Sequence, residues 1–302
     1  MNYFYYRISD NSYKKEKLPG ADKELCLRNC LETFKSDWDQ PRKKTLTDTW
    51  RPEPPRFRIL ADNIQSVETR QMLEKITAEY EVPVRYTNKG NAGSLIWSIR
   101  NAIDELPPYS IVYFIEDDYL HRKDADLREG FTVSVGPDES VDYVSLFDHP
   151  DKYSSLYKNG EYCRIFKSVC GNYWKSTQST TMTFASSVYT LKEDLDVWEK
   201  WTAEDHPQDH QIFTELTSHR GRLLLSPLPG RATHTDLAVS IGTRNMAVED
   251  WAIDIAIEHL EKKILAKEMD ASTTDVLESI KKQKGWERLK LLQALWVSLT
   301  EF

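Results

Sequence analysis

The chain has 302 residues, of which 40% are hydrophobic and 29% charged, and its formal net charge is -8 at pH 7. This composition excludes a disordered chain, and the length suffices for one large α/β domain with an appendix. The acidic balance disfavours tight binding of a polyanion by the chain as a whole. No apolar run could span a bilayer and no signal-peptide layout opens the chain, so we expect a soluble, cytoplasmic protein.

The N-terminal part of the sequence alternates strand-like and helix-like segments. In chain order we expect strands at residues 3–9, 56–62, 82–87 and 110–118, and helices at residues 22–34, 67–80 and 94–106. Ser66 is placed to cap the second of these helices. The fourth strand is apolar throughout, without polar alternation, which is typical of a parallel sheet covered on both faces.

The second part of the sequence is more mixed. We expect strands at residues 141–147, 180–190 and 221–227, and helices at residues 192–202 and 209–220. From residue 247 to the end the pattern is helical. We therefore divide the chain into a core domain at residues 1–246 and a helical extension at residues 247–302, which packs on the core or on another subunit.

Three adjacent acids, Glu116, Asp117 and Asp118, follow the apolar fourth strand. Adjacent carboxylates repel one another, so they need water or a cation. In an open α/β sheet, ligands bind beyond the carboxyl ends of the strands, and a hard divalent cation with diphosphate oxygens would suit these acids there. The alternative is a solvated acidic turn at a strand end.

The segment "YFIEDDYLH" resembles the D-x-D-type motif of glycosyltransferases with the GT-A fold. The resemblance implies a mixed, mostly parallel sheet flanked by helices, and a divalent cation, Mn²⁺ or Mg²⁺. It implies that Asp118 binds the metal and that Glu116 and Asp117 lie near the ribose or the metal. This chain has Glu-Asp-Asp in place of Asp-x-Asp, which leaves open which acid takes which role.

Other residues follow the order of that family along the chain. Arg7 stands where the first strand of the family meets the nucleotide, and Asp62 matches an acid that reads the base or the ribose. The glycine-containing loop "NKGNAGS" resembles the one before the acidic motif, and its backbone would approach the nucleotide. Its candidate nucleotide-binding residues are Gly90, Asn91 and Ser94. Taken singly, Arg7 could be a surface charge, Asp62 a turn former, and the loop an ordinary turn.

Two later residues complete the predicted site. Asp209 stands at a loop-to-helix junction, where inverting members of the family place the carboxylate that deprotonates the acceptor hydroxyl. Capping of the helix is the competing role. His234 lies in the loop "PLPGRATHTD", and by resemblance it is a second metal ligand, since imidazole suits manganese as well as zinc. A merely exposed histidine is the alternative.

The sequence thus predicts a metal-dependent glycosyltransferase that moves a sugar from a nucleotide diphosphate donor, with a UDP-sugar favoured, to an acceptor hydroxyl with inversion. The acceptor would be a glycan, a small molecule or modified DNA. Three alternatives stay open: a glycosyltransferase for a hydroxylated base in DNA, a metal-dependent nucleotidyltransferase or nuclease, and a non-catalytic nucleotide-binding module.

Overall fold

The computed structural model describes residues 2–10, 17–39, 54–153, 163–236, 249–266 and 271–300. Its centre is a nine-stranded sheet with the order β3-β2-β1-β4-β9-β6-β10-β8-β7, accompanied by the two-stranded sheet β11-β5. The strands are β1 (Asn2–Ser9), β2 (Phe57–Asp62), β3 (Val84–Thr87), β4 (Ile111–Glu116), β5 (Tyr119–His121), β6 (Tyr143–Val144), β7 (Ile165–Lys167), β8 (Tyr173–Ser176), β9 (Phe184–Ser187), β10 (Leu224–Leu228) and β11 (Ala232–His234).

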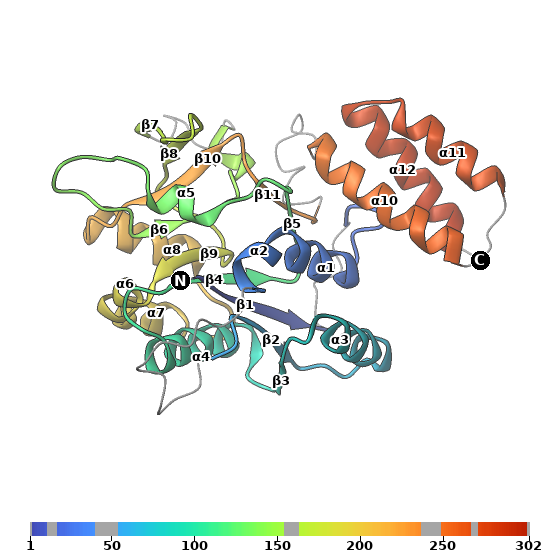
Figure 1. The fold of residues 1–302 in the computed structure, drawn as a ribbon. Coiled ribbons are helices and arrows are strands. Elements are labelled where there is room, and N and C mark those ends of the chain that lie inside the picture. Colours follow the sequence, from blue (N-terminus) through green and yellow to red (C-terminus); the bar gives the residue numbers. More distant parts are fainter. Residues whose placement is uncertain are drawn as a thin grey trace.

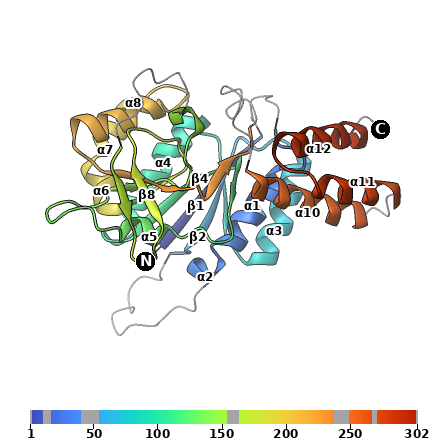
Figure 2. The same ribbon diagram turned by 90° about the horizontal axis from the view of Figure 1, so that it is seen from above.

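Helices flank the sheet on both faces, and three of them form a group at one side of the molecule (Figures 1 and 2). The helices of the described residues are α1 (Lys23–Thr33), α2 (Lys35–Trp38), α3 (Val67–Tyr80), α4 (Gly90–Glu105), α5 (Leu127–Phe131), η1 (Pro150–Tyr153), α6 (Val188–Glu193), α7 (Leu195–Trp201), α8 (Asp209–Thr214), η2 (Glu215–His219), α10 (Asp250–Ala266), α11 (Ala271–Lys281) and α12 (Gly285–Thr300). The predicted class, α/β with a mixed sheet between helices and a C-terminal helical extension, is confirmed. Among the described residues, no helix is both long and apolar enough to cross a membrane.

Strand β1 divides the core into two layers. Phe4 and Tyr6 point to the face covered by α1 and α3, whereas Tyr3 and Tyr5 point to the face covered by α4. Successive side chains of a strand alternate between faces, so a strand buried on both sides carries apolar residues at every position. This explains the absence of polar alternation in β1 and β4.

The pairing of the strands determines where their ends meet. Strands β3, β2, β1 and β4 are parallel neighbours, so Thr87, Asp62, Ser9 and Glu116 end at one edge of the sheet. Strand β9 runs antiparallel to both β4 and β6, and β10 runs parallel to β6. Beyond β4 the sheet is therefore mixed, while its N-terminal half is parallel as expected.

Several predicted boundaries differ from the structure, and two of the differences have an identifiable cause. The loop expected at residues 88–94 is the first turn of α4, which begins at Gly90, because the Asp62 carboxylate accepts the backbone N–H groups of Lys89 and Gly90. The strand expected at residues 180–190 ends at Ser187, where α6 begins. The Ser187 hydroxyl accepts the backbone N–H of Thr190 and so caps this helix.

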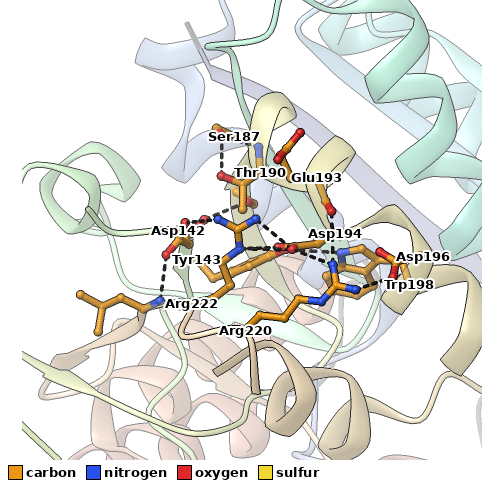
Figure 3. A network of polar contacts seen from close by, with 12 residues as sticks. Asp142, Tyr143, Ser187, Thr190, Glu193, Asp194, Asp196, Trp198, Arg220 and Arg222 are labelled. Carbon is orange, nitrogen blue, oxygen red and sulfur yellow. Dashed lines mark hydrogen bonds and ion pairs between the residues drawn. The ribbon is translucent and has the colours of Figure 1, made fainter. Parts of the chain in front are cut away.

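A buried carboxylate, Asp194, ties the junction of α6 and α7 to the sheet (Figure 3). Its Oδ2 accepts hydrogen bonds from the Tyr143 hydroxyl at 2.8 Å and from Arg222 Nε at 2.9 Å, and a second Arg222 nitrogen reaches its Oδ1 at 2.9 Å. Tyr143 begins β6 and Arg222 precedes β10. The network therefore lies at the edge opposite to the one where β4 ends, and it has a structural role.

The C-terminal helices share a hydrophobic cluster with the segment before and within α1. Leu18, Ala21 and Leu25 are buried against residues of α10 that include Ala256 and Leu260. The predicted boundary between residues 246 and 247 lies outside the described residues.

Candidate active site

A cavity of about 790 Å³ opens at the edge of the sheet where β1, β2 and β4 end. Every predicted site residue except Asp209 lines it. These residues are Arg7, Asp62, Gly90, Asn91, Ser94, Glu116, Asp117, Asp118 and His234. The shared edge of the parallel strands brings Asp62 and Glu116 together, whereas His234 reaches the cavity through the pairing of β11 with β5.

Arg7 joins the start of α4 to the acidic triplet. Its side chain is 6% exposed, and one terminal nitrogen lies 3.0 Å from the Asn91 carbonyl oxygen and 3.2 Å from Ser94 Oγ. The other terminal nitrogen donates to Glu116 Oε1 at 3.1 Å. The planar guanidinium fork holds both partners at once, which a lysine could not do.

Asp62 is fully engaged by the start of the α4 helix. Its two oxygens accept from the Thr87 hydroxyl at 2.7 Å, from the Asn63 amide at 2.9 Å, and from the backbone N–H groups of Lys89 at 2.7 Å and Gly90 at 3.0 Å. Four donors occupy the lone pairs of one carboxylate. In this arrangement Asp62 holds the first turn of α4, whose residues Gly90, Asn91 and Ser94 line the cavity.

The first two acids of the triplet face different cations. Burial raises the pKa of Glu116 to about 7. The nearby Arg7 guanidinium opposes this rise, because a positive charge favours the ionised carboxylate. Asp117 Oδ2 accepts the Ser9 backbone N–H at 3.1 Å, and the Lys23 ammonium contacts this same oxygen and the Ser9 carbonyl. The cations thus come from β1 and α1, which flank the triplet.

Asp118 and His234 are brought together by the pairing of β5 with β11. His234 lies opposite Tyr119 in this ladder, and its Nε2 is 3.2 Å from Asp118 Oδ2. His234 Nδ1 accepts the backbone N–H of Asp236 at 2.9 Å, so the neutral ring carries its proton on Nε2, facing Asp118. His234 therefore stands in a strand rather than in the expected loop. It would have to release that proton and the bond to Asp236 to ligate a metal through Nε2.

The second oxygen of Asp118, Oδ1, is buried without a hydrogen-bond partner. The pKa of Asp118 is lowered: burial raises it, but His234, Lys17 and Lys23 together outweigh that effect. Within the described ranges, no group of three or more His, Cys, Asp or Glu residues could hold a metal ion alone. Mg²⁺ is commonly bound by one or two protein carboxylates together with substrate phosphates, so an ionised, unpartnered oxygen fits a cation shared with a diphosphate.

Asp209 is the first residue of α8, as expected, but it does not line the cavity. Its carboxylate accepts the backbone N–H of His210 at 2.7 Å, whereas the N-cap position of α8 is occupied by Gln208. Its charge nevertheless contributes to the raised pKa of Glu116, which places it within electrostatic reach of the triplet.

Sequence reasoning missed several residues of the cavity wall. The backbones of Lys17 and Asp236 pair in an isolated antiparallel β-bridge, and both residues line the cavity. The segment 202–206 after α7 lines it as well. Nothing in the local pattern singles these residues out, because each reaches the site through a long-range contact.

Two neighbouring residues of β8 lie inside the fold. Trp174 is fully buried in the core. Lys175 beside it is 4% exposed, and its Nζ lies 2.7 Å from Asp148 Oδ1.

No family model and no curated protein matches the chain. Solved structures similar to it include 4-diphosphocytidyl-2C-methyl-D-erythritol synthase from Anaerococcus prevotii, with a TM-score of 0.36 and 11% identity over 86% of this chain and 96% of that one. Residues 1–349 of TarS from S. aureus have a TM-score of 0.35 and 18% identity over 98% and 78%. Mouse xyloside xylosyltransferase 1 has a TM-score of 0.32 and 8% identity over 74% and 84%. These scores are too low to assign a reaction or a substrate to this chain.

Proposed function

We propose that this protein transfers a sugar from a nucleotide diphosphate donor, with a UDP-sugar favoured, to an acceptor hydroxyl, and that the reaction depends on a divalent cation. The observation that carries the proposal is the buried, unpartnered Oδ1 of Asp118 in an acidic cavity at the ends of parallel strands. An anionic diphosphate would be repelled by the triplet unless a cation lay between them.

Each part of the cavity has a role in this proposal. Asp118 would hold the cation, Mn²⁺ or Mg²⁺. His234 would be a second ligand once the proton on its Nε2 had moved to Nδ1. Bound there, the cation would neutralise charge on the departing nucleoside diphosphate. Arg7 fixes the first turn of α4, whose backbone lines the nucleotide side. Asp209 is the proposed general base for the acceptor, which predicts inversion at the anomeric carbon.

Replacement of Asp118 by Asn tests the cation site. Asn keeps the size of the side chain but removes the negative charge. We expect UDP with Mn²⁺ to raise the thermal midpoint of the wild-type protein, because a ligand bound only to the folded state stabilises it. Asp118→Asn should abolish this shift, whereas Asp138→Asn, an exposed acid away from the cavity, should keep it.

Analysis of the products separates the proposal from its alternatives. Release of UDP from a UDP-sugar supports glycosyl transfer, whereas release of pyrophosphate would indicate a nucleotidyltransferase. A wild-type protein that shows no shift with any nucleotide would contradict the proposal. Retained anomeric configuration in the product, seen by NMR, would exclude the role given to Asp209.

A further inference from the structure

The C-terminal helix α10 packs against the segment that supplies two lysines to the cavity region. Leu18 is 1% exposed, and its backbone N–H donates to the Thr235 carbonyl at 2.7 Å, next to the β-bridge between the backbones of Lys17 and Asp236. Gly20 has a φ of +80°, and a Cβ there would lie 2.8 Å from Leu260 Cγ of α10. The backbone that carries Lys17 is thus held in contact with α10, at a position that only glycine fits.

The first turn of α1 connects α10 to the acidic triplet through two consecutive residues. Asp22 Oδ1 lies 3.4 Å from His259 Nε2, and Asp22 Oδ2 contacts the Lys263 ammonium, and both partners lie on α10. The neighbouring Lys23 reaches instead to Asp117 and to the Ser9 carbonyl. Asp22 also accepts the Leu25 backbone N–H at 2.8 Å as the cap of α1.

The charges along this path favour the same arrangement. Burial raises the pKa of Asp22, but His259, Lys263 and the Leu25 N–H outweigh it and lower that pKa, so Asp22 is ionised at neutral pH. Lys23 contacts the Asp117 carboxylate, next to Asp118 in the chain, and Lys17 lines the same cavity as Asp118. Both lysines therefore stand beside the carboxylate that the proposed function assigns to the cation.

We propose that α10 is a positioning part of the donor site, which sets Lys17 and Lys23 beside the triplet, where they attract the diphosphate of the donor. Asp22 is the positioning residue, because it receives α10 on one side and begins the helix that carries Lys23. This inference rests on the proposed function for the identity of the ligand. The coupling between α10 and the lysines does not depend on it.

Asp22→Asn and Lys263→Ala test the coupling without ligand. Asn caps helices as well as Asp does, so Asp22→Asn keeps the start of α1 while it removes the charge that α10 contacts. The matched control is Lys262→Ala, which removes an exposed lysine one residue away on the same helix. Hydrogen exchange of residues 17–27 should be faster in both test variants than in the control. Equal exchange in all three variants would overturn the proposal.

A second measurement tests the effect on the donor site. With Mn²⁺ present, we expect both test variants to bind UDP about fivefold more weakly than wild type, within the range for partly exposed ion pairs. Affinity for uridine, which lacks the diphosphate, should not change, whereas a general loss of structure would weaken both ligands. Lys263→Arg, which keeps the positive charge that Lys263→Ala removes, should bind UDP as well as wild type does.

The two measurements separate failure of this inference from failure of the proposed function. If wild type binds UDP and both test variants bind it equally well, the inference is overturned and the proposed function stands. If wild type binds no nucleoside diphosphate, the proposed function fails, and the exchange of residues 17–27 alone decides whether α10 positions the lysines.

Discussion

Asp209 begins helix α8 outside the cavity wall, yet its charge acts on the acidic triplet. Burial is the main cause of the raised pKa of Glu116, and Asp209 adds to that rise. A carboxylate at the start of α8 that acts on the triplet from outside the cavity wall is our proposed base for the acceptor hydroxyl.

Replacement of Asp209 by Asn should separate catalysis from donor binding. We expect kcat to fall by about 10²- to 10⁴-fold, the usual contribution of a general base, while the Kd for UDP with Mn²⁺ stays within a factor of two or so. Steady-state turnover and titration calorimetry measure the two quantities. Unchanged turnover would exclude Asp209 as the general base.

At the scale of elements, the buried Asp194 holds α6 and α7 to the strands β6 and β10 (Figure 3). Asp194 is fully buried. Asp196, two residues further on, has a side chain that is 69% exposed and pairs with Arg220. Asp194 and Asp196 thus allow a direct comparison of a buried and an exposed carboxylate at the start of α7.

Asp194→Ala should lower the free energy of unfolding by about 3–5 kcal/mol, because Arg222 then loses a buried partner. Asp196→Ala should cost about 1 kcal/mol or less, since exposed ion pairs contribute little. Urea denaturation of both variants and wild type measures the difference. Equal losses in the two variants would show that the buried network does not hold these elements together.

At the scale of the whole molecule, stability should depend on pH through His121. This residue is 0% exposed and contacts the Tyr113 hydroxyl at 2.7 Å, between α1 and the sheet. Burial lowers the pKa of His121 to about 3. In the unfolded chain this ring titrates near its ordinary pKa of about 6.5, so the unfolded state takes up a proton that the folded state refuses.

The contribution of His121 is therefore fully present above about pH 6.5 and declines as the pH falls toward 3, by up to about 1.4 kcal/mol per pH unit. His121→Gln removes the titrating group and keeps an acceptor for Tyr113. We expect this variant to be less stable at pH 7.5 but to lose less stability between pH 7 and pH 5. Unfolding curves with the same pH slope for both proteins would contradict this account.

Local patterns were sufficient for the main helices and strands of the N-terminal half. The helices α1 and α3 and the strands β1 and β4 were predictable because their apolar periodicity depends only on residues near in sequence. The place of the acidic triplet followed as well, since parallel strands end at a common edge. The start of α4 was misplaced because Asp62, distant in sequence, supplies its cap.

By itself, therefore, the sequence determined the alternation of strands and helices, the class of the sheet, and the gathering of Arg7 and Glu116 at one edge. Only the tertiary structure decided that β11 pairs with β5 and sets His234 against Asp118, and that α10 lies against the segment carrying Lys23. Periodicity is a local property of the chain, whereas these contacts depend on which distant surfaces bury each other.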